Sequence, residues 1–199
     1  MNIKLVFKLL GRILSMEAAV LVLPMAVALL YHESPMPFVW SILVILCISL
    51  PLSFLPAERH FHVREGFVSV GLLWLLTGVV GGLPFYFSGY FNSFIDCVFE
   101  ASSGFTTTGA TILTNIEALP YGILFWRAFT HWLGGMGVLV LVTAIVPSLG
   151  VRPHYLTQAE TPGPVFSKLV PKQSQTSKIL YQMYFALTLA EVILLKICG

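Results

Sequence analysis

Long uncharged apolar runs constrain this chain more than any other feature of its sequence. Met36 to Pro56 contains no charged residue, and neither does Phe67 to Tyr90. As a helix, the first run would reach about 31 Å, close to the thickness of the hydrocarbon core of a bilayer. With 57% hydrophobic and 10% charged residues, a chain of this size could not hide such runs in a soluble core. The sequence therefore predicts an all-α, multi-pass membrane protein.

Three further segments are long enough to span, although each carries a few charged residues. They are Leu9 to Tyr31, Tyr121 to Pro147 and Ile179 to Cys198. The first has a basic start, like a signal peptide, and small residues at Ala26 and Ala28 with the spacing of a cleavage site. Those small residues lie inside the apolar run, so an uncleaved spanning helix is the better interpretation.

The positions of the basic residues predict the orientation in the membrane. Basic residues cluster before the first span, between the second and third, and between the last two: Lys4, Lys8, Arg12, Arg59, Arg64, Arg152, Lys168, Lys172 and Lys178. The charged residues of the opposite loops are all acidic, namely Glu33, Asp96, Glu100 and Glu117. The positive-inside rule then predicts a cytoplasmic N-terminus, a cytoplasmic loop over 148–178 and an external region from Asn92 to Pro120.

The external region contains a segment that is too short to cross the membrane. Ser93 and Asp96 have the spacing of a capping-box-like helix start, which predicts a helix over about 94–103. About ten helical residues cover some 15 Å, or half a bilayer. The segment is too apolar to lie freely in water, so we expect a re-entrant half-helix sheltered by protein. The negative end of its dipole would then favour a cation near the membrane centre.

Three threonines and a glycine follow this half-helix. Backbone at membrane depth is tolerated where it lines a cavity, and cation filters use carbonyl oxygens to replace the hydration shell of the ion. Thr106, Thr107 and Thr108 would supply carbonyls, while Gly109 would allow a positive φ, as would Gly104 at the turn out of the helix. An ordinary external turn is the alternative for an isolated T-T-T-G run. The order of span, half-helix, T-T-T-G segment and span favours an ion filter over 104–110.

Three motifs in this order resemble one family. Ser103 to Thr111 (S-G-F-T-T-T-G-A-T) resembles the first filter of TrkH/KtrB potassium transporters of the Trk/Ktr/HKT superfamily. Phe125 to Gly137 resembles the helix after that filter, and Ala159 to Pro164 resembles the cytoplasmic link to the second repeat. The resemblance covers about 94–164, and outside the motifs Gly150 to Pro153 departs from a stretch that tends to be glycine-rich in relatives.

The resemblance implies two leading helices followed by four pseudo-repeated helix, pore-loop, helix units around one pore. On this chain the leading pair would occupy 1–56, the first repeat 67–147, and the first helix of an incomplete second repeat 179–199. Potassium would be the substrate, bound by the segment from Thr106 to Gly109 with the ion at Thr107 and Thr108, and no cofactor is implied. Repeats two to four are absent from the sequence, which is a large departure from the family.

Arg127 lies near the outer end of its span, and a charged side chain within a span is expected to have an acidic partner. Asp96, Glu100 and Glu117 are the candidates, and we expect an ion pair that braces the half-helix. His131 lies one turn further along the same helical face and is expected to belong to this polar seam. The glycines of Gly134-Gly135-x-Gly137 are expected to allow close helix packing.

Two functional alternatives remain beside potassium permeation. An intramembrane enzyme is disfavoured, because the sequence contains no H-E-x-x-H or G-x-S-x-G motif and no paired catalytic carboxylates. A truncated or split-gene subunit that does not conduct by itself is compatible with the missing repeats. In that case a second polypeptide would supply them.

The resemblance also implies partners and a location. These are a second copy of the complete transporter, forming a homodimer, and a cytoplasmic nucleotide-binding regulatory subunit of the TrkA/KtrA type. Nucleic acid is not an expected partner. The chain itself has no glycine-rich phosphate loop, so nucleotide binding is not expected from it. The implied location is the bacterial inner membrane.

Overall fold

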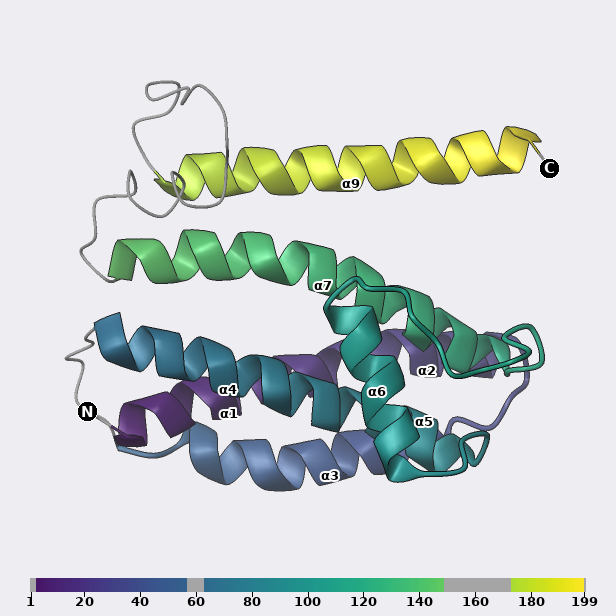
Figure 1. Cartoon of the computed structure of the whole chain (residues 1–199), viewed down its shortest axis with the longest axis horizontal. Coiled ribbons are helices and arrows are strands. Elements are labelled where there is room, and N and C mark those ends of the chain that lie inside the picture. Colours follow the sequence, from purple (N-terminus) through teal and green to yellow (C-terminus); the bar gives the residue numbers. More distant parts are fainter. Residues whose placement is uncertain (1–2, 57–62, 149–172, 199) are drawn as a thin grey trace. The chain divides into compact units, whose positions relative to one another are not determined.

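The computed structural model describes residues 3–56, 63–148 and 173–198, which form helices and their connections without a strand. In chain order the helices are α1 (Ile3–Val20), α2 (Val22–Leu30), α3 (Met36–Ser53), α4 (Val63–Gly81), α5 (Leu83–Ser88), α6 (Phe94–Phe105), α7 (Tyr121–Ser148) and α9 (Gln173–Cys198) (Figure 1). The chain divides into two compact units, residues 1–135 and 136–199, with the boundary inside α7. The predicted all-α class is confirmed.

Four helical stretches among the described residues are long and apolar enough to cross a membrane. They are Ile3–Leu30, Met36–Ser53, Val68–Ser88 and Ile179–Cys198. These stretches correspond to four of the five predicted spans, and α7 over Tyr121–Ser148 corresponds to the fifth. Most of the predicted cytoplasmic loop, residues 149–172, lies outside the described residues.

The helix boundaries differ from the predicted ones in three places. The leading span begins at Ile3 rather than Leu9 and is divided after Val20. The run from Phe67 to Tyr90 is two helices, because α4 ends at Gly81 and Pro84 occupies the first turn of α5, where a missing backbone N–H costs nothing. The last helix begins at Gln173 instead of Ile179, so the connection before it is shorter than predicted.

The leading helices α1 and α3 form a close antiparallel hairpin. A Cβ added at Gly11 would lie 2.6 Å from the backbone nitrogen of Ser53 and 2.8 Å from the carbonyl oxygen of Ser49. The hydroxyl group of Ser15 donates to that of Ser49 at 3.0 Å across the pair. Small residues and a hydroxyl bond at the contact are the usual means by which membrane helices associate. The hairpin therefore has a specific packed interface.

Helix α6 crosses α4 (Figure 1). It packs mainly against α4. A Cβ at Gly82 would lie 3.1 Å from the carbonyl carbon of Cys97, and one at Gly78 would overlap the hydroxyl group of Ser102. Gly78 is further from the end of the α4–α5 span than Gly82. Ser102 therefore lies nearer the middle of α4 than Cys97 does.

The interior of unit 1 is apolar, and so is much of its outside. The core consists of Leu14, Ala18, Leu21, Ala28, Phe38, Ile45, Val80, Phe85, Cys97, Ala101, Phe105, Leu119, Ile123 and Trp126. Large apolar side chains are exposed along α3, including Trp40, Leu43 and Ile48. Extended apolar surface of this kind is what a lipid-facing helix presents, whereas a water-soluble protein rarely exposes so much.

Candidate functional site: a re-entrant helix and an exposed threonine segment

The start of α6 follows its sequence signal. Ser93 has extended backbone angles, and its hydroxyl oxygen accepts a hydrogen bond from the backbone N–H of Ile95 at 3.2 Å. Asp96 lies in the first turn, where a carboxylate is favoured by the positive end of the helix dipole. The predicted helix start after Ser93 is therefore confirmed.

The other end of α6 lies near the middle of α7. A Cβ at Gly104 would overlap the side chain of Thr130, and a Cβ at Gly134 would overlap the backbone carbonyl of Phe105. Thr130 and Gly134 follow the start of α7 at Tyr121 by nine and thirteen residues, which corresponds to depths of about 14 and 20 Å. These contacts place the end of α6 about half-way along a helix of membrane-spanning length.

Gly134 is required for this approach, and a single methyl group tests it. Gly134→Ala would press a Cβ against backbone atoms of Phe105, which cannot move aside as a side chain could. We expect a loss of about 1–3 kcal/mol in the free energy of unfolding, as for other overpacked cores. Gly71→Ala in α4 is the control, because a Cβ there meets nothing within 4 Å. The measurement is thermal unfolding in detergent, and equal melting temperatures for the two variants would contradict the close contact.

The role predicted for Gly104 is wrong. The sequence predicted a turn with positive φ at this residue, but α6 continues through Phe105 and Gly104 is a buried helical residue. The positive-φ glycines among the described residues are Gly89 and Gly109. Gly104 is needed because Thr130 occupies the space that a Cβ would take. The segment outside the helix accordingly begins at Thr106 and not at residue 104.

After α6 the backbone forms a turn in which three successive N–H groups donate hydrogen bonds to carbonyls of α6. Thr106, Thr107 and Thr108 donate their amides to the carbonyls of Ser102, Gly104 and Ser103, each at 2.9 Å. Thr107 has φ of 56° and Gly109 has φ of 75°, so two residues of the turn are left-handed. The positive φ expected at Gly109 is confirmed, whereas the one at Thr107 was not predicted.

The carbonyl groups of the same segment are free. Among the described residues, no hydrogen bond is accepted by the backbone oxygens of Thr106, Thr107, Thr108 or Gly109. All four residues are exposed. In a membrane interior, unpaired carbonyl groups are strongly unfavourable unless water or an ion meets them. The segment therefore offers oxygen ligands at the depth where α6 ends.

Two hydroxyl groups hold the ends of the segment. Thr106 Oγ1 donates to the carbonyl of Ser102 at 2.8 Å and lies 2.9 Å from Thr108 Oγ1. Ser103 Oγ donates to the carbonyl of Ala110 at 2.6 Å, which returns the chain toward α6 after Gly109. The hydroxyl groups of Thr106 and Thr108 thus bind within the turn itself, and the backbone oxygens of the segment accept no hydrogen bond from the described residues.

Glu100 connects the half-helix to its two neighbours. Its Oε1 accepts from Arg127 Nε on α7 at 2.5 Å, and its Oε2 accepts from Thr111 Oγ1 at 3.0 Å and from the N–H of Ile112 at 3.4 Å. The Glu100 side chain is only 1% exposed, and that of Arg127 is 17% exposed. Among the three predicted candidates, the structure thus selects Glu100 as the acidic partner of Arg127.

His131 lies behind the threonine segment. Its Nδ1 is 2.9 Å from the carbonyl of Arg127, a position that requires this nitrogen to donate. Ideal Cβ atoms at Gly104 and Gly109 would lie 3.5 Å from Nδ1 and 4.0 Å from Nε2 of the ring, respectively. The imidazole therefore sits between the end of α6 and Gly109, within the polar seam predicted for it.

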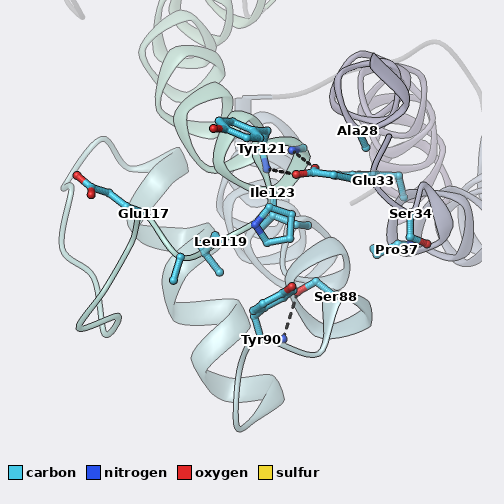
Figure 2. Close-up of a pocket in the computed structure, with 14 residues that line it drawn as sticks. Ala28, Glu33, Ser34, Pro37, Ser88, Tyr90, Glu117, Leu119, Tyr121 and Ile123 are labelled. Atoms are coloured by element: carbon cyan, nitrogen blue, oxygen red, sulfur yellow. Dashed lines mark hydrogen bonds between the residues drawn. The ribbon is translucent and has the colours of Figure 1, made fainter. Parts of the chain in front are cut away.

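A pocket of about 590 Å³ opens elsewhere in unit 1, and its lining does not include the threonine segment. Residues from the α2–α3 turn, the end of α5 and the start of α7 surround it (Figure 2). Glu33 is directed at the first turn of α7, where its two oxygens accept the N–H groups of Tyr121 at 2.7 Å and Gly122 at 2.9 Å. Tyr31 stacks on Tyr121 with ring centroids 4.3 Å apart. Glu33 is thus a helix cap, a role that its sequence position in a loop did not reveal.

These features define a helical, multi-pass membrane protein in which the short helix α6 ends against the middle of α7. Residues 36–198 match the family model described as a cation transport protein, TrkH. The chain belongs to the TrkH family of cation transport proteins. The family model describes its members as cation transport proteins.

The curated relatives are longer than this chain. The Trk system potassium uptake protein TrkH of Vibrio parahaemolyticus is 38% identical over 205 residues, covering 100% of this chain and 42% of the relative. TrkH of Halomonas elongata is 39% identical over 197 residues, covering 94% and 40%. TrkG of Escherichia coli is 34% identical over 181 residues, covering 88% and 37%. The chain thus spans about two fifths of the length of the curated relatives that it matches.

Proposed function

We propose that this chain takes part in potassium uptake, and that Thr106 to Gly109 form one of four filter segments around a single pore. The observation that carries the proposal is the set of free backbone oxygens at the end of a half-helix that reaches the middle of α7. Carbonyl oxygens at this depth are the ligands that replace the hydration shell of potassium in cation filters. The relatives are named as potassium uptake proteins, which favours potassium over other cations.

The site residues have separate roles in this proposal. Thr107 and Thr108 bind the ion through their carbonyls, flanked by Thr106 and Gly109. The C-terminal end of α6 adds the negative end of its dipole. Asp96 favours the start of α6, while Glu100 and Arg127 hold α6 to α7 and to the chain that leaves the filter. Gly104 allows α6 to approach Thr130.

The domain organisation follows from the four-segment pore. Residues 1–56 are the two leading helices and 67–147 the body of the first pore repeat. Helix α9, from Gln173, is the first helix of a second repeat, and the connection between α7 and α9 is cytoplasmic. The bacterial inner membrane is the proposed location, with a cytoplasmic N-terminus. A homodimer of the complete transporter and a regulatory subunit of the TrkA/KtrA type are the proposed partners.

A second candidate function is a split-gene subunit. In this candidate the chain provides one set of filter oxygens, from Thr106 to Gly109, and does not conduct by itself. A dehydrated potassium ion needs several sets that converge on it. In this case a second polypeptide carries the remaining repeats, and residues 1–199 insert into the membrane without conducting.

Potassium uptake in a deficient bacterial host tests both candidates. Residues 1–199 alone are expected to restore no uptake, while co-expression with the last three repeats of a TrkH relative is expected to restore it. Membrane-fraction immunoblots verify insertion in each strain. Uptake by residues 1–199 alone would contradict the one-of-four assignment and point to a homotetrameric pore. Absence of uptake with the repeats present, despite normal insertion, would contradict a conducting role.

A further inference from the structure

Glu17 is a buried carboxyl group that the proposed pore does not use. It lies on α1, and the residue is 7% exposed among core residues that include Leu14, Ala18 and Leu21. Neither Oε1 nor Oε2 of Glu17 has a hydrogen-bond partner among the described residues. Buried polar atoms in proteins are nearly always paired, so an unpaired carboxyl group inside a membrane-spanning helix requires an explanation.

The carboxyl group lies where two helices end. A Cβ at Gly81, the last residue of α4, would be 3.2 Å from Glu17 Oε1 and would also press on the ring of Phe105, the last residue of α6. The carbonyl of Gly81 is occupied by Trp126 Nε1, at 2.9 Å. The C-terminal ends of helices carry partial negative charge, which disfavours an anion. Both the apolar surroundings and the helix ends therefore oppose an ionised Glu17.

No described side chain compensates a negative charge at this position. Helices α2, α3 and α4 pack against α1, and α2 and α3 contain no Asp, Glu, Lys or Arg. The remaining ionisable groups on these helices and on α6 and α7 are Cys47, Arg64, Glu65, Asp96, Cys97, Glu100, Tyr121, Arg127 and His131. Of the cationic groups among them, Arg127 is bound to Glu100, and Arg64 is seventeen residues before Gly81, at the opposite end of α4. On α1 itself, Arg12 is exposed.

A bound metal cation would need more ligands than this position offers. Alkali and alkaline-earth cations take about six or more oxygen ligands, and one carboxyl group supplies two. The described residues contain no group of three His, Cys, Asp or Glu side chains that could hold a metal ion. A proton requires only one carboxyl oxygen. The proton is therefore the ligand that fits.

We propose that Glu17 is a proton-binding site inside the membrane, occupied by the neutral carboxylic acid where α1 packs against the end of α4 beside the ring of Phe105. Loss of the proton would leave an unpaired negative charge between these helices, which is strongly unfavourable. The chain would then have to admit water or separate α1 from α4. Because α6 ends at this place, the occupancy of the site is coupled to the position of the half-helix. The proton site itself does not depend on whether Thr106 to Gly109 conduct potassium.

Infrared spectroscopy of the full-length transporter tests the proposal without an activity assay. A neutral carboxylic acid has a C=O stretch that is separate from the carboxylate bands and shifts in D₂O. At neutral pH the wild-type protein is expected to have such a band, and Glu17→Gln is expected to lack it. Glu33→Gln is the control, because the Glu33 carboxylate accepts two backbone N–H groups and should contribute no such band. Identical spectra for wild type and Glu17→Gln would overturn the proposal.

Thermal unfolding of the same variants provides the second measurement. Glutamine is a neutral replacement of similar shape, so Glu17→Gln is expected to keep the melting temperature at neutral pH. At alkaline pH the wild type is expected to lose stability through loss of the proton, whereas Glu17→Gln is expected to lose less. A large drop in melting temperature for Glu17→Gln at neutral pH would indicate that an ionised Glu17 has a partner, and would overturn the neutral acid.

Discussion

Replacing Gly109 by serine in the four-repeat transporter is expected to reduce the selectivity for potassium over sodium by about tenfold, through backbone strain and not through a steric clash. The residue has φ of 75°, a conformation that costs a residue with a Cβ roughly 1–2 kcal/mol. A Cβ would meet nothing closer than His131 Nε2 at 4.0 Å, so the substitution changes backbone preference without a steric clash. A cost of 1.4 kcal/mol is a factor of ten, which gives the expected size of the effect. Rubidium and sodium fluxes in proteoliposomes provide the measurement.

A second glycine provides a matched control for this substitution. Gly89 has φ of 74°, almost the same as Gly109, and a Cβ there also meets nothing within 4 Å. It caps α5, outside the threonine segment. Gly89→Ser should therefore carry the same backbone strain and leave ion selectivity unchanged. If both variants keep full selectivity, the T-T-T-G run is an ordinary turn and the filter assignment fails.

Glu100→Gln is expected to lower the free energy of unfolding by about 3 kcal/mol and to abolish most transport. The substitution keeps an oxygen for Thr111 but leaves the Arg127 guanidinium without its anion. Removing one member of a buried ion pair costs about 3–5 kcal/mol. The lower end applies because the Arg127 side chain retains 17% exposure. Thermal unfolding in detergent gives the stability, and flux measurements give the transport rate.

Two further variants separate the ion pair from a general effect of charge. Asp96→Asn removes a carboxylate from the first turn of the same helix, which is expected to lower the free energy of unfolding by about 0.5 kcal/mol. The double variant Glu100→Gln, Arg127→Met removes both charges and is expected to recover part of the stability lost in Glu100→Gln. If Asp96→Asn and Glu100→Gln lower the free energy of unfolding equally, the contacts of Glu100 with Arg127, Thr111 and Ile112 do not stabilise the structure.

The sequence predicted those parts of the fold that depend on local signals. The uncharged runs located the spans, and the spacing of Ser93 and Asp96 located the start of α6. These features are encoded within a few turns of helix, so no knowledge of neighbouring elements is needed. The positive φ at Gly109 is of the same kind, because a glycine after three threonines indicates a special backbone conformation.

The features that the sequence did not predict depend on contacts between distant residues. Gly104 indicated a turn by local criteria, yet it is helical because Thr130 of α7 leaves no room for a Cβ. Glu17 is a charged residue within the predicted span from Leu9 to Tyr31, and its burial depends on the packing of α1 against α3 and α4. The choice of Glu100 over Asp96 and Glu117 likewise required the position of Arg127.

The cap that Glu33 provides has a consequence for the order of assembly. Glu33 and Tyr121 are 88 residues apart in the chain, and the start of α7 depends on the former for two of its N–H partners. During synthesis the N-terminal part emerges and folds first. The hairpin of α1 to α3 is therefore already in the bilayer when Tyr121 leaves the ribosome. The Glu33 carboxylate is then in place to accept the first N–H groups of α7. The leading hairpin thus determines where the first turn of α7 is placed, through Glu33. Because α7 contacts Phe105 at Gly134, the hairpin also determines indirectly where α6 ends.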